Sequence, residues 1–182
     1  MENKDVYELT NPQKSIWYME EFFKGSNINN ICGNITINET VDFKKLKDAI
    51  NIFIHSNDCF NIRIILDNNV PKQYLCEFGN LDFDIININS KDEIISIEKE
   101  MVSQTFNIID SPLFAFKLFK LPNGHGGVVM NIHHIISDAA TIAIISTGVA
   151  KIYSNLMKNF NLDIETSSYI DYINAEKNYL ES

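Results

Sequence analysis

The chain has 182 residues, of which 45% are hydrophobic and 21% are charged. This length and composition are typical of one folded domain, or of two small lobes at most, with an apolar core. A formal net charge of −9 argues against nucleic acid or an anionic membrane as the main partner. No apolar stretch approaches the roughly 20 residues of a membrane span, and the polar start Met-Glu-Asn-Lys-Asp lacks a signal-peptide pattern, so we expect a cytoplasmic protein without a membrane partner.

The three cysteines, Cys32, Cys59 and Cys76, are widely spaced and form no Cys-x-x-Cys pair. This spacing disfavours a zinc ribbon or a redox dithiol. We expect buried free thiols, as in proteins of a reducing compartment.

The first third of the chain predicts a helix, a strand and a second helix. Thr10, with a following proline and with Gln13 three positions on, signals the start of a helix over 11–24. Residues 31–37 alternate in polarity, which indicates a strand. Asp42 caps the next helix. The core-facing residues expected from the two helices are Ile16, Met19, Phe22 and Phe23, with Trp17 at the margin, and then Leu46, Ala49, Ile50, Phe53 and Ile54.

The middle of the chain predicts three strands and a third helix. Strands over 60–66 and 70–76 flank the turn signal Asp67-Asn68-Asn69 and form a hairpin. A further strand covers 83–88. The sequence Ser90-Lys91-Asp92-Glu93 is a capping box that opens a helix to about Thr105.

The last third predicts two strands and two helices. Residues 113–119 and 128–132 pair across a glycine-containing turn, and a helix follows from Asp138. A polar linker at 159–168 leads to a final helix over 169–180.

The element order α β α β β β α β β α α predicts an α/β (α+β) sandwich in a single domain over 1–182. In such a fold a mixed, largely antiparallel sheet is flanked by helices. No phosphate-binding loop is expected, because the glycines at 124–127 precede a strand rather than a helix.

Residues 128–138 combine an apolar strand, two adjacent histidines and an aspartate. Side chains alternate along a strand, so His133 and His134 point to opposite sides. His134 continues the more apolar row, where the strand gives way to a loop. Such a place suits a partly desolvated imidazole that accepts a proton near neutral pH, and His134 is therefore the candidate catalytic residue.

Asp138 allows two interpretations. It can cap the helix that follows, or it can pair with Arg63, the single arginine, on what we expect to be a central strand. The histidine pair can also be simple packing at a strand end. A metal site that uses His134 and Asp138 lacks a third ligand at a useful spacing, so we expect no metal.

The segment from His133 to Ala139, His-His-Ile-Ile-Ser-Asp-Ala, resembles the His-His-x-x-x-Asp-Gly core motif of the condensation domains of nonribosomal peptide synthetases. Residues 9–17 are similar to the family's first motif, Ser/Thr-x-x-Gln-x-x-x-Trp. Residues 54–63 lie where the second motif closes a helix and opens a strand. Residues 168–182 are similar to the segment that leaves the first lobe, so the resemblance spans essentially the whole chain.

The resemblance implies a chloramphenicol-acetyltransferase-like fold, in which two lobes enclose a tunnel with the motif at its centre. The chain is similar to the N-terminal lobe only, so we expect a truncated or naturally split piece of a larger synthetase. The implied partners are the missing C-terminal condensation lobe, an adenylation domain and peptidyl or acyl carrier protein domains.

In this family, the amine of a carrier-bound acceptor attacks the thioester of a carrier-bound donor, and an amide forms. The resemblance makes His134 the catalytic residue, either as the base on the amine or as the group that orients it. Asp138 becomes a structural residue held by an arginine, and here Arg63 is the candidate. Both substrates travel on the phosphopantetheine arms of carrier proteins, and no directly bound cofactor is implied.

Two positions depart from the family pattern. Ala139 replaces the motif's glycine and adds a methyl group near the path of a substrate arm, and Asn61 stands near where an arginine is usual. Two alternatives stay open: an acyl-CoA-dependent O/N-acyltransferase of the same fold, and a non-catalytic docking or scaffold domain. We expect the isolated lobe to be inactive, because the tunnel needs both walls.

Overall fold

The computed structural model describes residues 5–161, 166 and 168–180. Its strands are β1 (Val6–Glu8), β2 (Asn30–Ile37), β3 (Ile62–Asp67), β4 (Val70–Leu75), β5 (Ile85–Asn87), β6 (Phe114–Lys120) and β7 (Gly126–His133). Its helices are α1 (Asn11–Phe22), α2 (Phe43–His55), α3 (Asp92–Ser103), α4 (Thr141–Lys158) and α5 (Tyr169–Leu180), with 3-10 turns η1 (Asp58–Asn61) and η2 (His134–Ile136).

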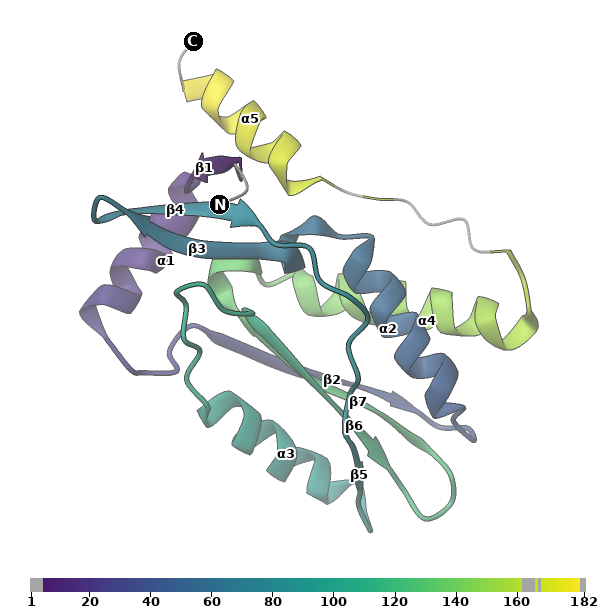
Figure 1. Ribbon diagram of the computed structural model, residues 1–182. Helices are drawn as coiled ribbons and strands as arrows, with labels where there is room; N and C mark the ends of the chain where they lie inside the picture. Colours follow the sequence, from purple (N-terminus) through teal and green to yellow (C-terminus); the bar gives the residue numbers. More distant parts are fainter. Residues whose placement is uncertain (1–4, 162–165, 167, 181–182) are drawn as a thin grey trace.

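The strands form two sheets rather than the single sheet expected from the sequence (Figure 1). One sheet has the order β1-β4-β3 and the other has the order β2-β7-β6-β5. Among the named strands of the described chain, only β5 and β6 pair in parallel, so the prediction of a mixed, largely antiparallel α/β fold is confirmed. Strand β1 was not predicted, because three residues are too few to show an alternating pattern.

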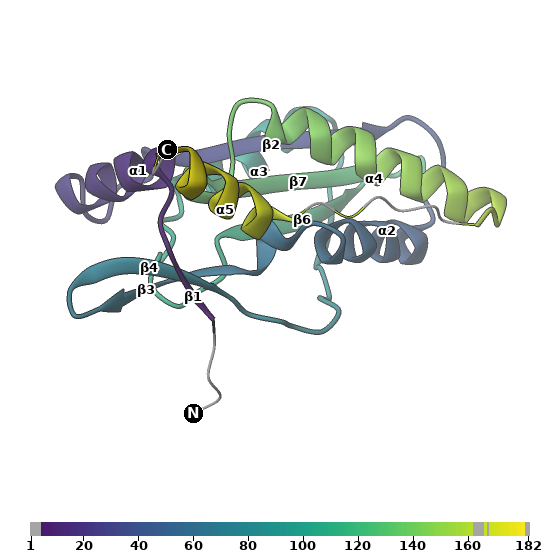
Figure 2. The same cartoon turned by 90° about the horizontal axis from the view of Figure 1, so that it is seen from above.

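Strand β7 forms the centre of the larger sheet, and all eight of its residues are buried. Its Val128, Met130 and Ile132 belong to the main apolar core, together with residues of α2 and α4. Val129 belongs to a smaller cluster with residues of α3. Helices therefore cover both faces of this sheet, with α3 on one side and α2 and α4 on the other, as Figures 1 and 2 show.

Helix α2 follows the sequence prediction closely. Asp42 accepts a hydrogen bond from the backbone N–H of Lys45 at 3.1 Å, which is the expected N-cap. The predicted apolar stripe is buried in full: Leu46, Ala49, Ile50, Phe53 and Ile54. Burial of each large side chain in such a stripe contributes about 1.5–3 kcal/mol, so packing rather than helix propensity stabilises α2.

Helix α1 begins as predicted but buries a different face. Thr10 and Gln13 form the reciprocal capping box. Trp17, expected at the margin, is only 5% exposed, whereas Phe22, expected in the core, is 81% exposed. The Trp17 face of the helix is the buried one because its polar side chains have hydrogen-bond partners in the interior, which are described with the site below.

Several boundaries differ from the sequence predictions, and one predicted cap does not form. The strand expected from residue 60 is preceded by the turn η1 and begins at Ile62. Helix α4 begins at Thr141 rather than at Asp138, because η2 and a short loop follow β7. The capping box at 90–93 is not formed by side chains; instead, the carboxylate of Glu93 accepts from the backbone N–H of Asn89 at 2.8 Å.

The three cysteines are free, as expected, but they are half-buried rather than fully buried. Burial raises the pKa of the Cys59 thiol to about 12 and that of the Cys32 thiol to about 11. Both groups are therefore protonated thiols near neutral pH, which makes them poor nucleophiles.

Helix α5 has the predicted bounds and lies beside the start of α1. The backbone N–H of Tyr169 donates to Asp58 at 2.6 Å, and the Tyr169 hydroxyl lies 3.4 Å from the Thr10 hydroxyl. Ile173 is the buried residue of this helix. Half of the linker predicted for 159–168 lies outside the described residues. No helix in the described part of the chain is long and apolar enough to span a membrane.

Candidate active site

His133 ends β7 and is held in the interior, where it is 2% exposed. Its Nδ1 accepts a hydrogen bond from the backbone N–H of Ile135 at 3.1 Å. Because Nδ1 accepts, Nε2 carries the hydrogen of the neutral ring and donates to Glu20 Oε1 at 3.0 Å. Burial lowers the pKa of His133 below its ordinary value, although the hydrogen bond to Glu20 opposes this shift. His133 is therefore a structural side chain with a fixed tautomer.

Glu20 and Asn29 complete a buried network around His133. The side-chain amide of Asn29 donates to the same Glu20 oxygen at 2.6 Å, and the backbone carbonyl of Asn29 accepts from the N–H of His134 at 2.8 Å. The Phe106 ring packs nearly perpendicular to the His133 ring, with the two centroids 5.9 Å apart. Helix α1, the loop before β2 and the end of β7 thus converge on the histidine pair.

Gln13 of α1 forms hydrogen bonds both to the turn after β7 and to the smaller sheet. Its side-chain amide donates to the backbone carbonyl of Ile135 at 3.2 Å. The amides of Gln13 and Gln73 pair reciprocally at 2.8 Å, and Gln73 also donates to the carbonyl of Glu8 at 2.9 Å. Gln13 therefore holds the backbone of η2, and Gln73 holds Gln13.

His134 is half-buried and begins η2. Its Nδ1 lies 2.5 Å from the backbone carbonyl oxygen of Ser137. A carbonyl oxygen only accepts, so Nδ1 carries the hydrogen of the neutral ring and Nε2 keeps a free lone pair. The turn that carries His134 therefore sets its tautomer and leaves Nε2 able to accept a proton or a hydrogen bond.

Asp138 is exposed and is held by its own turn. Its carboxylate accepts from the N–H of Ala140 at 3.0 Å and from the hydroxyl of Thr141 at 2.8 Å, and its N–H donates to that hydroxyl oxygen at 2.8 Å. These bonds hold the turn before α4, but the N-cap of that helix is Ala140 and it has no side-chain cap, so Asp138 is not the N-cap that the sequence allowed. Ala139, beside it, is exposed as well.

The expected ion pair between Arg63 and Asp138 is wrong. Arg63 lies on β3, an edge strand of the smaller sheet rather than a central strand, and it is only 6% exposed. Its Nη1 donates to the backbone carbonyls of Phe60 and Ile62 at 3.1 and 2.7 Å. Asn61, near the position where the resemblance implies an arginine, has a buried side-chain oxygen without a described hydrogen-bond donor.

The sequence identified both histidines and Asp138 but missed Glu20, Asn29 and Gln73. Gln13 was noted as a capping residue and as the glutamine of the first family motif, but not as a buried partner of the turn after β7. A signal for two of these partners was present, because Gln13, Trp17 and Glu20 stand at positions i, i+4 and i+7 of one helix face. Taking Trp17 as the core residue would have placed Gln13 and Glu20 inside.

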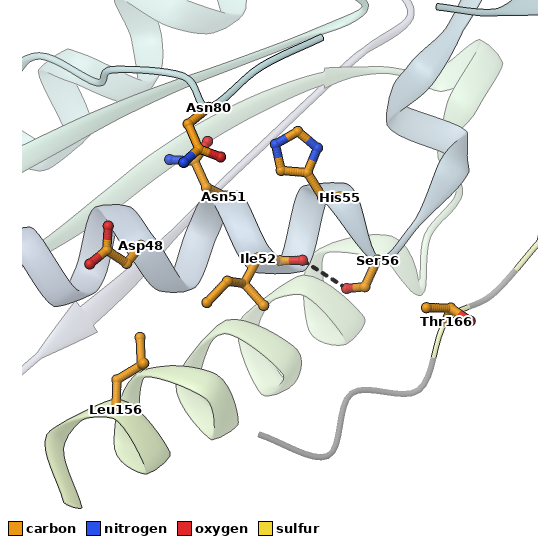
Figure 3. A pocket seen from close by; sticks show the side chains of 8 residues that line it. All are labelled: Asp48, Asn51, Ile52, His55, Ser56, Asn80, Leu156 and Thr166. Carbon is orange, nitrogen blue, oxygen red and sulfur yellow. Dashed lines mark hydrogen bonds between the residues drawn. The ribbon is translucent and has the colours of Figure 1, made fainter. Parts of the chain in front are cut away.

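A pocket of about 560 Å³ opens between α2 and α4, away from the motif (Figure 3). Asp48 and His55 face it, and its Asn51 is fully engaged by the backbone of Leu81 and Lys47. In Figure 3 the Ser56 hydroxyl donates back to the carbonyl of Ile52 at 2.9 Å. Neither histidine of the motif lines the pocket, and no group of three potential metal ligands is found in the part of the chain that the structure describes.

The chain is similar to known proteins over nearly its whole length. Residues 3–182 match the family model described as Condensation domain, so the chain belongs to the condensation domain family. It is 30% identical over 184 residues to surfactin synthase subunit 1 of Bacillus subtilis (strain 168), covering 97% of this chain and 5% of that relative. It is 26% identical to one of the plipastatin synthase proteins of the same organism, covering 99% of this chain and 7% of that relative.

Solved structures give the same fold. The starter condensation domain of rhizomide synthetase superposes with a TM-score of 0.87 at 20% identity, over 98% of this chain and 44% of that chain. The first condensation domain of the calcium-dependent antibiotic synthetase superposes with a TM-score of 0.86 at 16% identity, over 98% of this chain and 45% of that chain. The chain thus spans under half of a solved condensation domain, and its fold matches one lobe.

Proposed function

We propose that the chain is the histidine-bearing lobe of a nonribosomal peptide synthetase condensation domain that joins a carrier-bound donor acyl group to a carrier-bound acceptor amine. The observation that carries this proposal is His134. It occupies the catalytic place of the family motif, and its Nδ1–H is committed to the carbonyl of Ser137. The free Nε2 lone pair is what an attacking amine requires.

In the proposed reaction, the acceptor's amine nitrogen attacks the donor's thioester carbon. A C–N bond forms, the C–S bond breaks, and the phosphopantetheine thiolate leaves. One proton leaves the nitrogen, and His134 Nε2 either accepts it or orients the N–H by a hydrogen bond. The Glu20–Asn29–His133 network keeps the backbone of His134 in place, and positioning of both substrates supplies much of the rate.

We propose carrier protein domains, an adenylation domain and a C-terminal condensation lobe as partners, in a cytoplasmic synthetase.

Helix α1 supports a carrier-docking role, because the side opposite its buried face exposes a group of large apolar side chains. They are Tyr18, Met19, Phe22 and Phe23. Such a patch is rare on a surface without a partner, and we assign it to a carrier domain. Phe22→Glu should then weaken carrier binding and leave the melting temperature unchanged.

The test of catalysis uses the parent synthetase with its donor- and acceptor-loaded carriers. His134→Ala should reduce product formation at least a hundredfold, while His125→Ala, in the β6–β7 hairpin, should leave it unchanged. Unchanged turnover by His134→Ala would remove the catalytic assignment and favour a scaffold role. We expect the 182-residue chain alone to form no product, because it spans under half of a solved condensation domain.

A second candidate differs in the acyl donor. The rhizomide starter condensation domain was solved in complex with C8-CoA, and it shares the fold of this chain. The same assay should therefore compare octanoyl-CoA with octanoyl-loaded carrier. Product from the CoA thioester alone would move the assignment to an acyl-CoA-dependent acyltransferase.

A further inference from the structure

A second pocket, of about 320 Å³, lies beside β3 and β6 and contains no residue of the histidine motif. Its walls are mostly apolar and aromatic: Phe78, Leu81, Phe83, Pro112, Phe114 and Phe116. The rings pack against one another, with Phe78 and Phe114 centroids 6.1 Å apart and Phe83 and Phe116 centroids 5.8 Å apart. One cationic side chain, Arg63, also lines the pocket.

The Arg63 guanidinium is fixed in one orientation. Both hydrogens of Nη1 are used by the carbonyls of Phe60 and Ile62, and the group lies over the Phe78 ring, 5.6 Å from its centroid. Within the described residues, no acceptor bonds to Nε or Nη2. These two atoms form the edge of the guanidinium that binds a carboxylate with two parallel hydrogen bonds.

The charge balance of the pocket favours an anion. Its one carboxylate, Asp82, is bound by Lys47 Nζ at 2.5 Å, and this lysine lowers the pKa of Asp82. Arg63 has no carboxylate within ion-pair distance among the described residues. Arg63 Nε and Nη2 are not among the buried unpartnered atoms of the described residues, so a ligand can reach them, and a carboxylate there would form a charge-assisted pair.

We propose that this pocket binds a small carboxylate with an apolar, preferably aromatic, body. The carboxylate accepts from Nε and Nη2 of Arg63, and the body lies among the phenylalanine rings. The pocket is pre-organised for this ligand class, because the guanidinium and the rings are already held by the protein. A phosphate monoester fits less well, since its remaining charged oxygens would face apolar walls.

The experiment compares 3-phenylpropionate with its neutral analogue 3-phenylpropionamide, titrated into the 182-residue chain and followed by backbone amide chemical shifts. A ligand of this size is expected to bind with a Kd of about 1 mM. The amide should bind at least about tenfold more weakly, because it lacks the charge-assisted pair. Shift changes should cluster at β3, β6 and residues 78–83. Equal binding of the two compounds, or no binding by either, would overturn the proposal.

Two substitutions sharpen the comparison. Arg63→Lys keeps the charge and loses the planar fork, so it should weaken 3-phenylpropionate binding about tenfold. His134→Ala, outside the pocket, should leave the Kd unchanged. If Arg63→Lys fails to fold, the acid–amide pair on the unmodified chain still decides the outcome. Because neither readout uses turnover, failure here is separate from failure of the proposed condensation activity.

Discussion

The two ends of the His133–Asp138 segment are held in opposite ways. At the first end, His133 is buried and bonded to Glu20 of α1, and Glu20 also accepts from Asn29 in the loop before β2. At the second end, Asp138 is exposed and bonds only within its own turn, to Ala140 and Thr141. The difference shows that the position of His134 depends on residues far away in sequence, whereas the start of α4 depends on near neighbours.

The energetic consequence follows from solvent access. A buried hydrogen bond that loses one partner leaves the other partner unsatisfied, and water cannot replace it. An exposed bond that is lost is replaced by water. Substitutions at the His133 end should therefore destabilise the fold several times more than substitutions at the Asp138 end.

The largest effect is expected for Glu20→Leu. This change leaves the Nε2–H of His133 and the side-chain amide of Asn29 buried without their acceptor, so the free energy of unfolding should fall by about 3 kcal/mol. Urea unfolding followed by circular dichroism measures it. The control is Glu21→Leu, at an exposed neighbour that pairs only with Lys24. A loss below about 0.5 kcal/mol for Glu20→Leu would mean that the network contributes no stability.

A smaller effect is expected for Gln13→Leu. The substitution removes the donor to the carbonyl of Ile135 and both hydrogen bonds of the amide pair with Gln73, at an expected loss of about 2 kcal/mol. It should also release η2, so the side-chain NMR signals of His134 should shift or broaden. Lys14→Leu, one position further along α1, is the matched control. An unchanged His134 signal would show that the turn holds without Gln13.

Asp138→Ala should destabilise the chain by about 1 kcal/mol, because it removes two exposed hydrogen bonds of the turn before α4. The sequence interpretation, a buried ion pair with Arg63, predicted about 3–5 kcal/mol for the same change. The two values are far enough apart for a single denaturation curve to separate them. A loss above about 3 kcal/mol would restore a partner for Asp138 that the structure does not show.

The sequence was informative where side chains act locally or where burial follows hydrophobicity. The cap and apolar stripe of α2, the hairpin of β3 and β4 and the bounds of α5 all came from such patterns. It failed for α1, where polar Gln13 and Glu20 occupy the buried face. Hydrophobic periodicity treats these residues as surface, because it cannot detect Gln73 and His133, their partners 60 and 113 positions away along the chain.

The candidate site shows the same limit. The motif identified His133, His134 and Asp138, but no local pattern shows that Arg63 bonds to the carbonyls of Phe60 and Ile62 instead of to Asp138. The local polarity pattern also could not predict the division of the strands into two sheets. This division depends on β1 pairing with β4 across a sequence separation of more than 60 residues. Long-range polar contacts and strand order therefore had to come from the structure.

The smallest effect is expected for Ala139→Gly, which restores the residue of the family motif. Ala139 is exposed and lies in the turn held by Asp138, so the change removes no buried contact. Glycine raises the entropy of the unfolded chain, and the free energy of unfolding should fall by only about 0.5 kcal/mol. The control is Ala143→Gly in the first turns of α4, an exposed helical site where about 1 kcal/mol is expected. If Ala139→Gly instead lowers the free energy of unfolding more than Ala143→Gly does, the methyl group of Ala139 packs against the His133–Asp138 segment. The Asp138 end would then depend on more than its exposed hydrogen bonds.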